Sequence, residues 1–165
     1  MVSSCVTKRQ NNSWHEYPSA PFFFNLKMGS VSVIIDHVRE ENIAQQVYSI
    51  AETFIESRQK NYNRIDKTLL LNISVEQRSF MHNVDMYNSI FISVNALDEE
   101  GNIYTRKNEF ISGKKTFIAA SEQNIIITRI LRRVLREQRK YNNNSQKYES
   151  SLEKEIQRQE RNTDG

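Results

Sequence analysis

The feature that most constrains the fold is an alternation of apolar and polar residues that runs, with two breaks, from Thr68 to Ile111. Apolar residues take every second position in its first two parts: Leu69, Leu71, Ile73 and Val75, then Ile90, Ile92, Val94 and Ala96. Such a period of two is typical of strands with one buried face. We therefore expect three consecutive antiparallel strands, with a tight turn at Gly101 before the third.

A helix is predicted on each side of this meander. Apolar residues before it recur at three- and four-residue spacing, at Ile43, Val47, Ile50, Ala51 and Phe54, and a short buried strand at 31–35 precedes them. A second helix, from Ser121 to Tyr141, has an apolar stripe at Ile127, Ile130, Leu131, Val134 and Leu135. The sequence thus predicts an α+β fold, a two-layer sandwich with the order strand–helix–strand–strand–strand–helix. Its four strands form a largely antiparallel sheet, and the two helices cover one face.

The 165 residues are enough for one domain with tails. Residues 1–30 are polar and contain both prolines, so we expect a lipidated or disordered tether. The aromatic residues of that segment, which include Trp14 and the run at 22–24, cover a sheet edge or form a patch that touches a partner or membrane. Residues 31–141 form the predicted domain. Residues 142–165 are a polar, charged tail and a marginal helix with a thin stripe of Tyr148, Leu152 and Ile156.

Catalytic and metal-binding patterns are not evident, so we expect no enzyme activity, cofactor or metal site. The three histidines, His15, His37 and His82, are far apart in the sequence. The segment around Gly113 lacks the spacing of a phosphate-binding loop. The single cysteine, Cys5, excludes an intrachain disulfide, and no apolar run approaches the ~20 residues of a membrane-spanning helix.

The strongest charge feature is the polar side of the second helix. Six basic residues lie there against Glu122 and Glu137: Arg129, Arg132, Arg133, Arg136, Arg139 and Lys140. They form a solvated helix face, or they bind an acidic partner or an anionic membrane surface. Nucleic acid ranks last among the candidate partners, because aromatic residues suited to base stacking do not interleave with the charges.

The start of the chain resembles the end of a bacterial lipoprotein signal. Val2-Ser3-Ser4-Cys5 has an aliphatic residue at minus three, two small residues, and then the cysteine that is lipidated. The charged start and apolar stretch of such a signal do not precede Cys5 here, so lipidation requires that they were removed or lie upstream. Otherwise Cys5 is a free thiol in a tail.

The predicted topology, together with Val2-Ser3-Ser4-Cys5, resembles small periplasmic lipoproteins. These are the lipopolysaccharide-assembly lipoprotein family and the auxiliary lipoproteins of ABC-type lipid-transport systems. The resemblance implies a non-catalytic protein of the bacterial cell envelope that faces the periplasm and is anchored to the membrane through Cys5. It would act as an accessory or assembly component of an outer-membrane or lipid-transport complex. The alternative is a soluble, cytoplasmic binding module whose helix at 129–140 contacts nucleic acid or an acidic protein.

Overall fold

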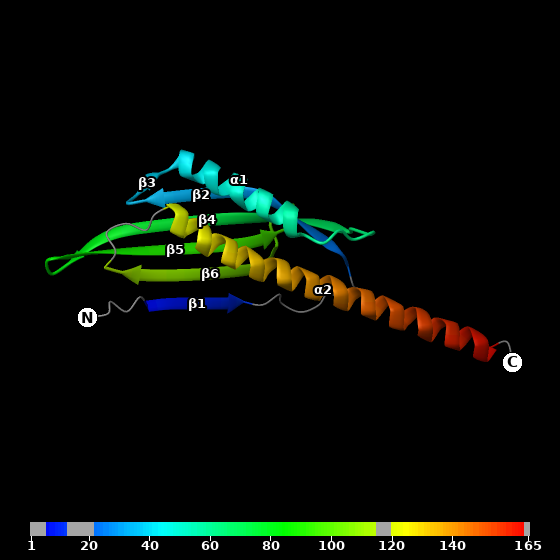
Figure 1. Cartoon of the computed structure of the whole chain (residues 1–165). Coiled ribbons are helices and arrows are strands. Elements are labelled where there is room, and N and C mark those ends of the chain that lie inside the picture. The colour runs from blue at the N-terminus through cyan, green and yellow to red at the C-terminus, as the bar shows by residue number, and fades with distance from the viewer. Residues whose placement is uncertain (1–5, 13–21, 115–119, 164–165) are drawn as a thin grey trace.

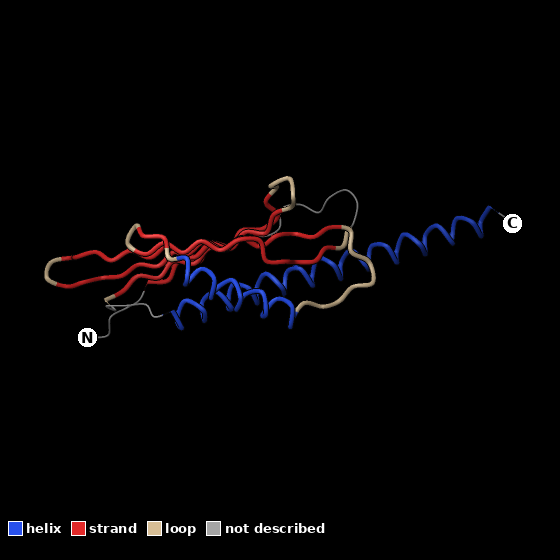
Figure 2. Tube along the Cα trace, turned by 90° about the horizontal axis from the view of Figure 1, so that it is seen from above, coloured by secondary structure: helices blue, strands red, loops and turns tan. Residues whose placement is uncertain are grey.

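The chain folds into a six-stranded sheet with both helices on one face (Figures 1 and 2). The computed structural model describes residues 6–12, 22–114 and 120–163. The strands are β1 (Val6–Asn12), β2 (Phe24–Ile35), β3 (Val38–Arg39), β4 (Lys67–His82), β5 (Asp85–Leu97) and β6 (Ile103–Gly113). The helices are α1 (Glu41–Arg58) and α2 (Ala120–Thr163).

The strand order is β1-β6-β5-β4-β2-β3. The predicted meander is present as β4, β5 and β6, which pair antiparallel. Strand β2 pairs parallel with β4 through the crossover helix α1, and β1 pairs antiparallel with β6. The α+β fold class with two helices on one face is confirmed. The sheet has two more strands than expected, because β1 and the short β3 extend its edges.

The core lies between the sheet and the helices. The alternating residues predicted for the buried face of β4 and β5 are all buried, as is the predicted apolar stripe of α2. Helix α1 is turned slightly from its predicted orientation, since Ala44, Val47, Ala51 and Ile55 are buried while Ile50 is exposed. The two alanines let α1 approach the sheet closely. Gly101 has a φ of +87°, as expected for the turn between β5 and β6.

Strand β2 begins at Phe24, earlier than the predicted start at Val31. Phe24 is fully buried, and its backbone is held by α2: its N–H donates to Asn142 Oδ1, and its carbonyl accepts from Gln138 and Asn142. A register shift between Met28 and Val31 lets the strand continue through Gly29, at the end of the segment predicted to be a tether. Tertiary contacts therefore create this half of the strand.

Helix α2 continues to Thr163 instead of ending at Tyr141. The Asn-rich segment that predicted its end lies within the helix, where Asn142 and Ser145 are buried. Residues 150–161 are almost all exposed, and the helix extends well past the sheet (Figure 1). No helix in the described part of the chain is long and apolar enough to span a membrane.

Strand β1 lies in the segment predicted to be a tether. Its pairing with β6, from Val6 opposite Ser112 to Asn12 opposite Arg106, is formed by residues distant in the sequence, which a local composition argument does not detect. The division of the whole chain into tether, domain and tail stays a prediction.

Candidate partner-binding surface

The six basic residues predicted to bind a partner lie on one side of α2, away from its apolar stripe. Four of them are exposed, namely Arg132, Arg136, Arg139 and Lys140, while Arg129 and Arg133 are half-buried. The structure divides them into residues that hold the helix to the sheet and residues that face solvent.

Arg129 and Arg133 hold α2 to the sheet. Both pair with Glu109 of β6, whose carboxylate is fully buried, and the distance from Arg133 Nη2 to Glu109 Oε2 is 3.0 Å. Next to them, Lys107 of β6 is 2% exposed and its Nζ lies 2.8 Å from Glu137 Oε1. Buried ionic groups of this kind must be paired to be tolerated. These two arginines therefore have a structural role within the fold.

Arg132 takes part in a cluster around one aromatic ring. The Arg58 guanidinium lies 5.1 Å and the Arg132 guanidinium 5.7 Å from the centre of the Phe54 ring. Arg139 donates to the backbone carbonyl of Arg58 at 3.3 Å. The cluster lies at the C-terminus of α1, where the helix dipole favours positive charge. Arg58 was not among the basic residues predicted from the sequence, because only helix packing brings it beside α2.

We call Arg58, Arg132, Arg136, Arg139 and Lys140 the basic surface. Within residues 22–114 and 123–161, none of these five side chains forms an ion pair with a carboxylate. Guanidinium groups bind carboxylate and phosphate groups in a planar, two-point geometry. The basic surface can thus accept an anionic partner without first breaking an internal ion pair.

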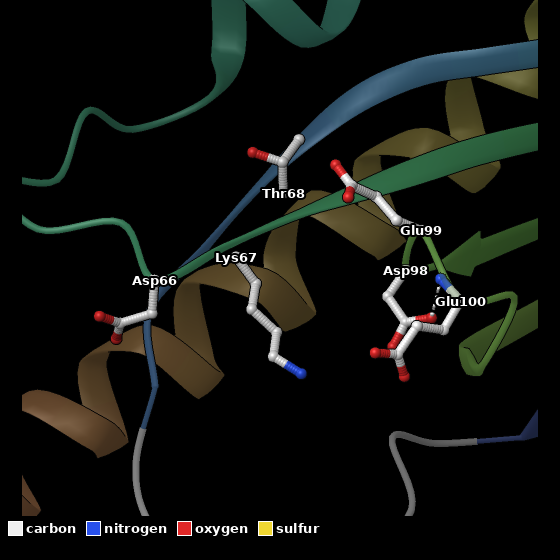
Figure 3. Close-up of a pocket in the computed structure, with 6 residues that line it drawn as sticks. All are labelled: Asp66, Lys67, Thr68, Asp98, Glu99 and Glu100. Carbon is white, nitrogen blue, oxygen red and sulfur yellow. Dashed lines mark hydrogen bonds between the residues drawn. The ribbon is translucent and has the colours of Figure 1, made fainter.

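A polar hollow of about 280 Å³ lies where β4 begins and β5 meets β6 (Figure 3). Its lining is mostly acidic: Asp66, Lys67, Thr68, Asp98, Glu99 and Glu100. Lys67 Nζ donates to the Tyr104 hydroxyl at 3.0 Å, and this hydrogen bond raises the pKa of Lys67. The hollow therefore combines one stabilised ammonium group with several carboxylates.

Two of these carboxylates are used by the fold. Asp98 accepts hydrogen bonds from the Asn102 side chain and from backbone N–H groups of its own turn, and these lower its pKa. Burial raises the pKa of Asp66, but the Phe23 N–H and the Arg64 guanidinium outweigh it and hold that pKa below its ordinary value. No group of acidic, histidine or cysteine side chains in the described residues is arranged to hold a metal. We assign the hollow no chemistry.

The remaining candidates from the sequence lie apart from one another. Cys5, the predicted lipidation site, and His15 lie outside the described residues. His37 is in the turn between β2 and β3, and His82 lies at the end of β4, where its ring packs edge-on against Tyr87. Asp36 does not pair with His37, because its carboxylate accepts hydrogen bonds from Ser79.

Comparisons with known proteins give a structural resemblance and no sequence family. No protein-family model matches the chain, and no curated protein matches its sequence. Two solved structures of PelC dodecamers from Paraburkholderia phytofirmans, one of them a point variant, are similar to it. Identity is 12% for the variant and 11% for the other, and both comparisons cover 76% of this chain and 95% of that chain with a TM-score of 0.41. Neither function nor assembly follows from a likeness at this level, and the two lipoprotein families suggested by the sequence stay a prediction.

Proposed function

We propose that this chain is a non-catalytic, membrane-anchored envelope lipoprotein that acts as an accessory or assembly component of an outer-membrane or lipid-transport complex. The anchor would be Cys5, on the pattern Val2-Ser3-Ser4-Cys5. The observation that carries partner binding is the basic surface, which faces solvent and forms no ion pair with a carboxylate among the described side chains. The partner would be an envelope protein that presents carboxylates.

The geometry of the basic surface supports such a role. Arg58 and Arg132 pack against the Phe54 ring, which restricts their side chains before a partner arrives. Restricting long side chains in advance reduces the entropy lost on binding. Arg136 and Lys140 follow one turn apart on the same side of α2, so they extend the positive charge along the helix.

The anchor is tested by the intact mass of protein expressed in a bacterium with its natural upstream region and extracted from membranes with detergent. We expect a species that begins at Cys5 and carries diacylglycerol or three acyl chains. The Cys5→Ser variant should remain unmodified, and its amount in the membrane fraction should fall. An unmodified soluble species that retains Met1 would contradict the anchor.

The partner surface is tested by crosslinking in cells with a triple variant, Arg132→Gln, Arg136→Gln and Lys140→Gln. We expect capture of the envelope partner to fall at least about tenfold, since three charged contacts are removed. A matched control carries Lys154→Gln, Arg158→Gln and Arg161→Gln in the exposed end of α2. Arg133 is left unchanged because it pairs with Glu109. Equal capture by both variants would refute the role of the basic surface.

The alternative function uses the same surface in the cytoplasm. A binding module of this kind would contact nucleic acid or an acidic protein through residues 129–140. Binding to duplex DNA would weaken steeply with salt, with a slope set by the number of phosphates neutralised. An unlipidated chain whose DNA affinity follows that slope and is lost in the triple variant would favour this alternative.

A further inference from the structure

Strands β4 and β5 extend past their neighbours and form a two-stranded arm. The pairing of β2 with β4 ends at Gln77, and the pairing of β6 with β5 ends at Asn88. Among the described residues, the strand pairing of residues 78–87, which we call the hairpin arm, is therefore with each other, and the arm projects from one end of the sheet (Figure 1). Its turn is tight, and Asn83 takes the left-handed conformation there, with a φ of +58°.

Exposed apolar side chains lie on both faces of the hairpin arm. Val84 at the apex is 91% exposed and Met81 is 62% exposed. Met81 lies opposite Met86 on one face, and Phe80 lies opposite Tyr87 on the other, with the two rings stacked at 5.7 Å. A solvated ribbon normally has a polar face. The arm thus exposes large apolar side chains on both faces, and the polar pair of His82 and Asp85 lies nearer the turn on the face of Phe80.

Other exposed apolar side chains lie at the end of the sheet from which the arm projects, which agrees with an apolar environment there. Val38 of β3 and Ile125 in the second turn of α2 are also exposed, and both elements lie at the end from which the arm projects (Figure 1). Two ion pairs involve residues of the arm: Asp85 with Lys114, and Arg78 with Glu76 at its base. Pairing lowers the cost of moving these charges toward a region of low polarity.

The first strand of the sheet starts at the same end. Val6 pairs with Ser112, beside the point where the arm leaves the sheet at Ser89, which also pairs with Ser112. A lipid on Cys5, which directly precedes Val6 in the sequence, would therefore enter the membrane on this side of the domain.

We propose that the hairpin arm is a second membrane contact, which inserts Phe80, Met81, Val84 and Met86 into the surface of a phospholipid bilayer. A bilayer surrounds an inserted tip, which matches apolar side chains on both faces, whereas a protein groove on one face would leave the other exposed. The paired charges of Asp85 and Lys114 would lie at the level of the headgroups. The role of the arm as a second anchor rests on the proposed lipidation, but its affinity for a bilayer does not.

The test uses the full chain carrying Cys5→Ser, so that lipidation plays no part. An environment-sensitive fluorophore is attached at Val84→Cys and, in a matched control, at Ser151→Cys on the exposed end of α2. Vesicles of phosphatidylethanolamine and phosphatidylglycerol are added. We expect the emission at position 84 to shift to the blue and the emission at position 151 to stay unchanged. An unchanged emission at position 84 would overturn the proposal.

A second measurement uses unlabelled variants. Replacing Met81, Val84 and Met86 together by serine should lower partitioning onto the same vesicles by about tenfold or more, since the apolar contact is removed. Ile103→Ser, an exposed apolar residue at the opposite end of the sheet, should leave partitioning unchanged. Circular dichroism establishes that each variant is folded. Equal partitioning of the triple variant and the parent would overturn the proposal, as would a label at position 84 that responds to a purified envelope protein but not to vesicles.

These outcomes are separate from those of the anchor test. If the Cys5→Ser chain does not bind vesicles while Cys5 of the natural protein is acylated, the arm alone is refuted. An unmodified Cys5 with a vesicle-binding arm would refute the anchor alone.

Discussion

At the scale of single residues, Gly29 occupies the position where one added carbon should matter most. A Cβ there would lie 2.3 Å from Asn72 Oδ1, the atom that accepts a hydrogen bond from Ser30 N–H. We expect Gly29→Ala to lower the free energy of unfolding by about 1–3 kcal/mol, because Asn72 must move and its hydrogen bond is lost. Urea unfolding measures this change.

A double variant gives the control for Gly29. Adding Asn72→Ala removes the atom that the new Cβ would meet. The two changes together should cost less than the sum of the two alone. Additive costs would contradict a steric origin.

Asp36 is expected to make stability depend on pH. Its hydrogen bond from the Ser79 backbone N–H, followed by that from the Ser79 hydroxyl, holds the pKa of Asp36 below its ordinary value of 3.8. A lowered pKa in the folded state adds stability above the unfolded-state pKa, and that stability is lost as the pH falls through the folded-state pKa. We expect Asp36→Asn to reduce the fall in the urea midpoint between about pH 5 and pH 2.

The Asp36 variant should keep its turn, because asparagine tolerates the positive φ of this position. Some pH dependence should remain, since the pKa values of Asp66 and Asp98 are also lowered. A variant whose midpoint falls as steeply as that of the parent would show that the Ser79 contact contributes nothing.

The ion pairs of Glu109 predict that removal of its two arginine partners costs more stability than removal of Glu109 itself. Removing Arg129 and Arg133 together leaves a fully buried carboxylate without its guanidinium partners, whereas removing Glu109 leaves two partly exposed arginines that water can reach. We expect the double arginine-to-alanine variant to lose about 3–5 kcal/mol and Glu109→Ala to lose less. Chemical denaturation of both variants under the same conditions makes the comparison. Equal losses would mean that burial of Glu109 carries no penalty of its own.

At the scale of elements, the spacing of apolar residues predicted the strands and helices whose buried faces are evident within one segment of the sequence. The strands β4 and β5, their buried faces and the apolar stripe of α2 follow from residues that alternate or recur within one segment. Strand β1 and the first half of β2 do not, because their partners lie far away in the chain. The Asn-rich segment of α2 is helical because Asn142 binds the Phe24 backbone, a tertiary contact that overrides helix propensity.

The candidate surface was predictable to the same extent. The spacing of its arginines placed them correctly on one side of α2. The contacts of Arg129 and Arg133 with Glu109 depend on how α2 packs on the sheet, and the spacing does not predict them. The packing of α1 against α2 likewise brings Arg58 beside Arg132. One signal in the sequence was available: Lys107 and Glu109 occupy the buried phase of β6, where charged residues need partners.

The exposed end of α2 should behave as a separate element. Residues 150–161 are almost all exposed, so they lack the packing that stabilises the helix at 126–142. We expect amide hydrogens of residues 152–161 to exchange much faster than those of residues 127–138, measured by mass spectrometry. Truncation after Ser150 retains the ion pair of Arg64 with Glu149, and should change the free energy of unfolding by less than about 1 kcal/mol. Slow exchange in residues 152–161 would indicate that this segment is packed against something in solution.

At the scale of the whole molecule, the two ends of the sheet differ. The hairpin arm, Val38, Ile125 and the start of β1 lie at one end, and the exposed half of α2 extends from the other (Figure 1). The basic surface lies on the helix layer between them. If the arm end faces a membrane, α2 points away from it, and the basic surface can meet a partner at a distance from the bilayer.

The pairing of β1 with β6 has a mechanical consequence. Tension between an anchor before Val6 and a partner held by the basic surface would pull β1 along its own axis. The β1–β6 hydrogen bonds run across the strands, so such a load is shared by the whole ladder from Val6 to Asn12 at once. Shear of this kind resists rupture far better than opening one bond at a time. The first strand would thus act as a strain-bearing joint between the membrane and the rest of the domain.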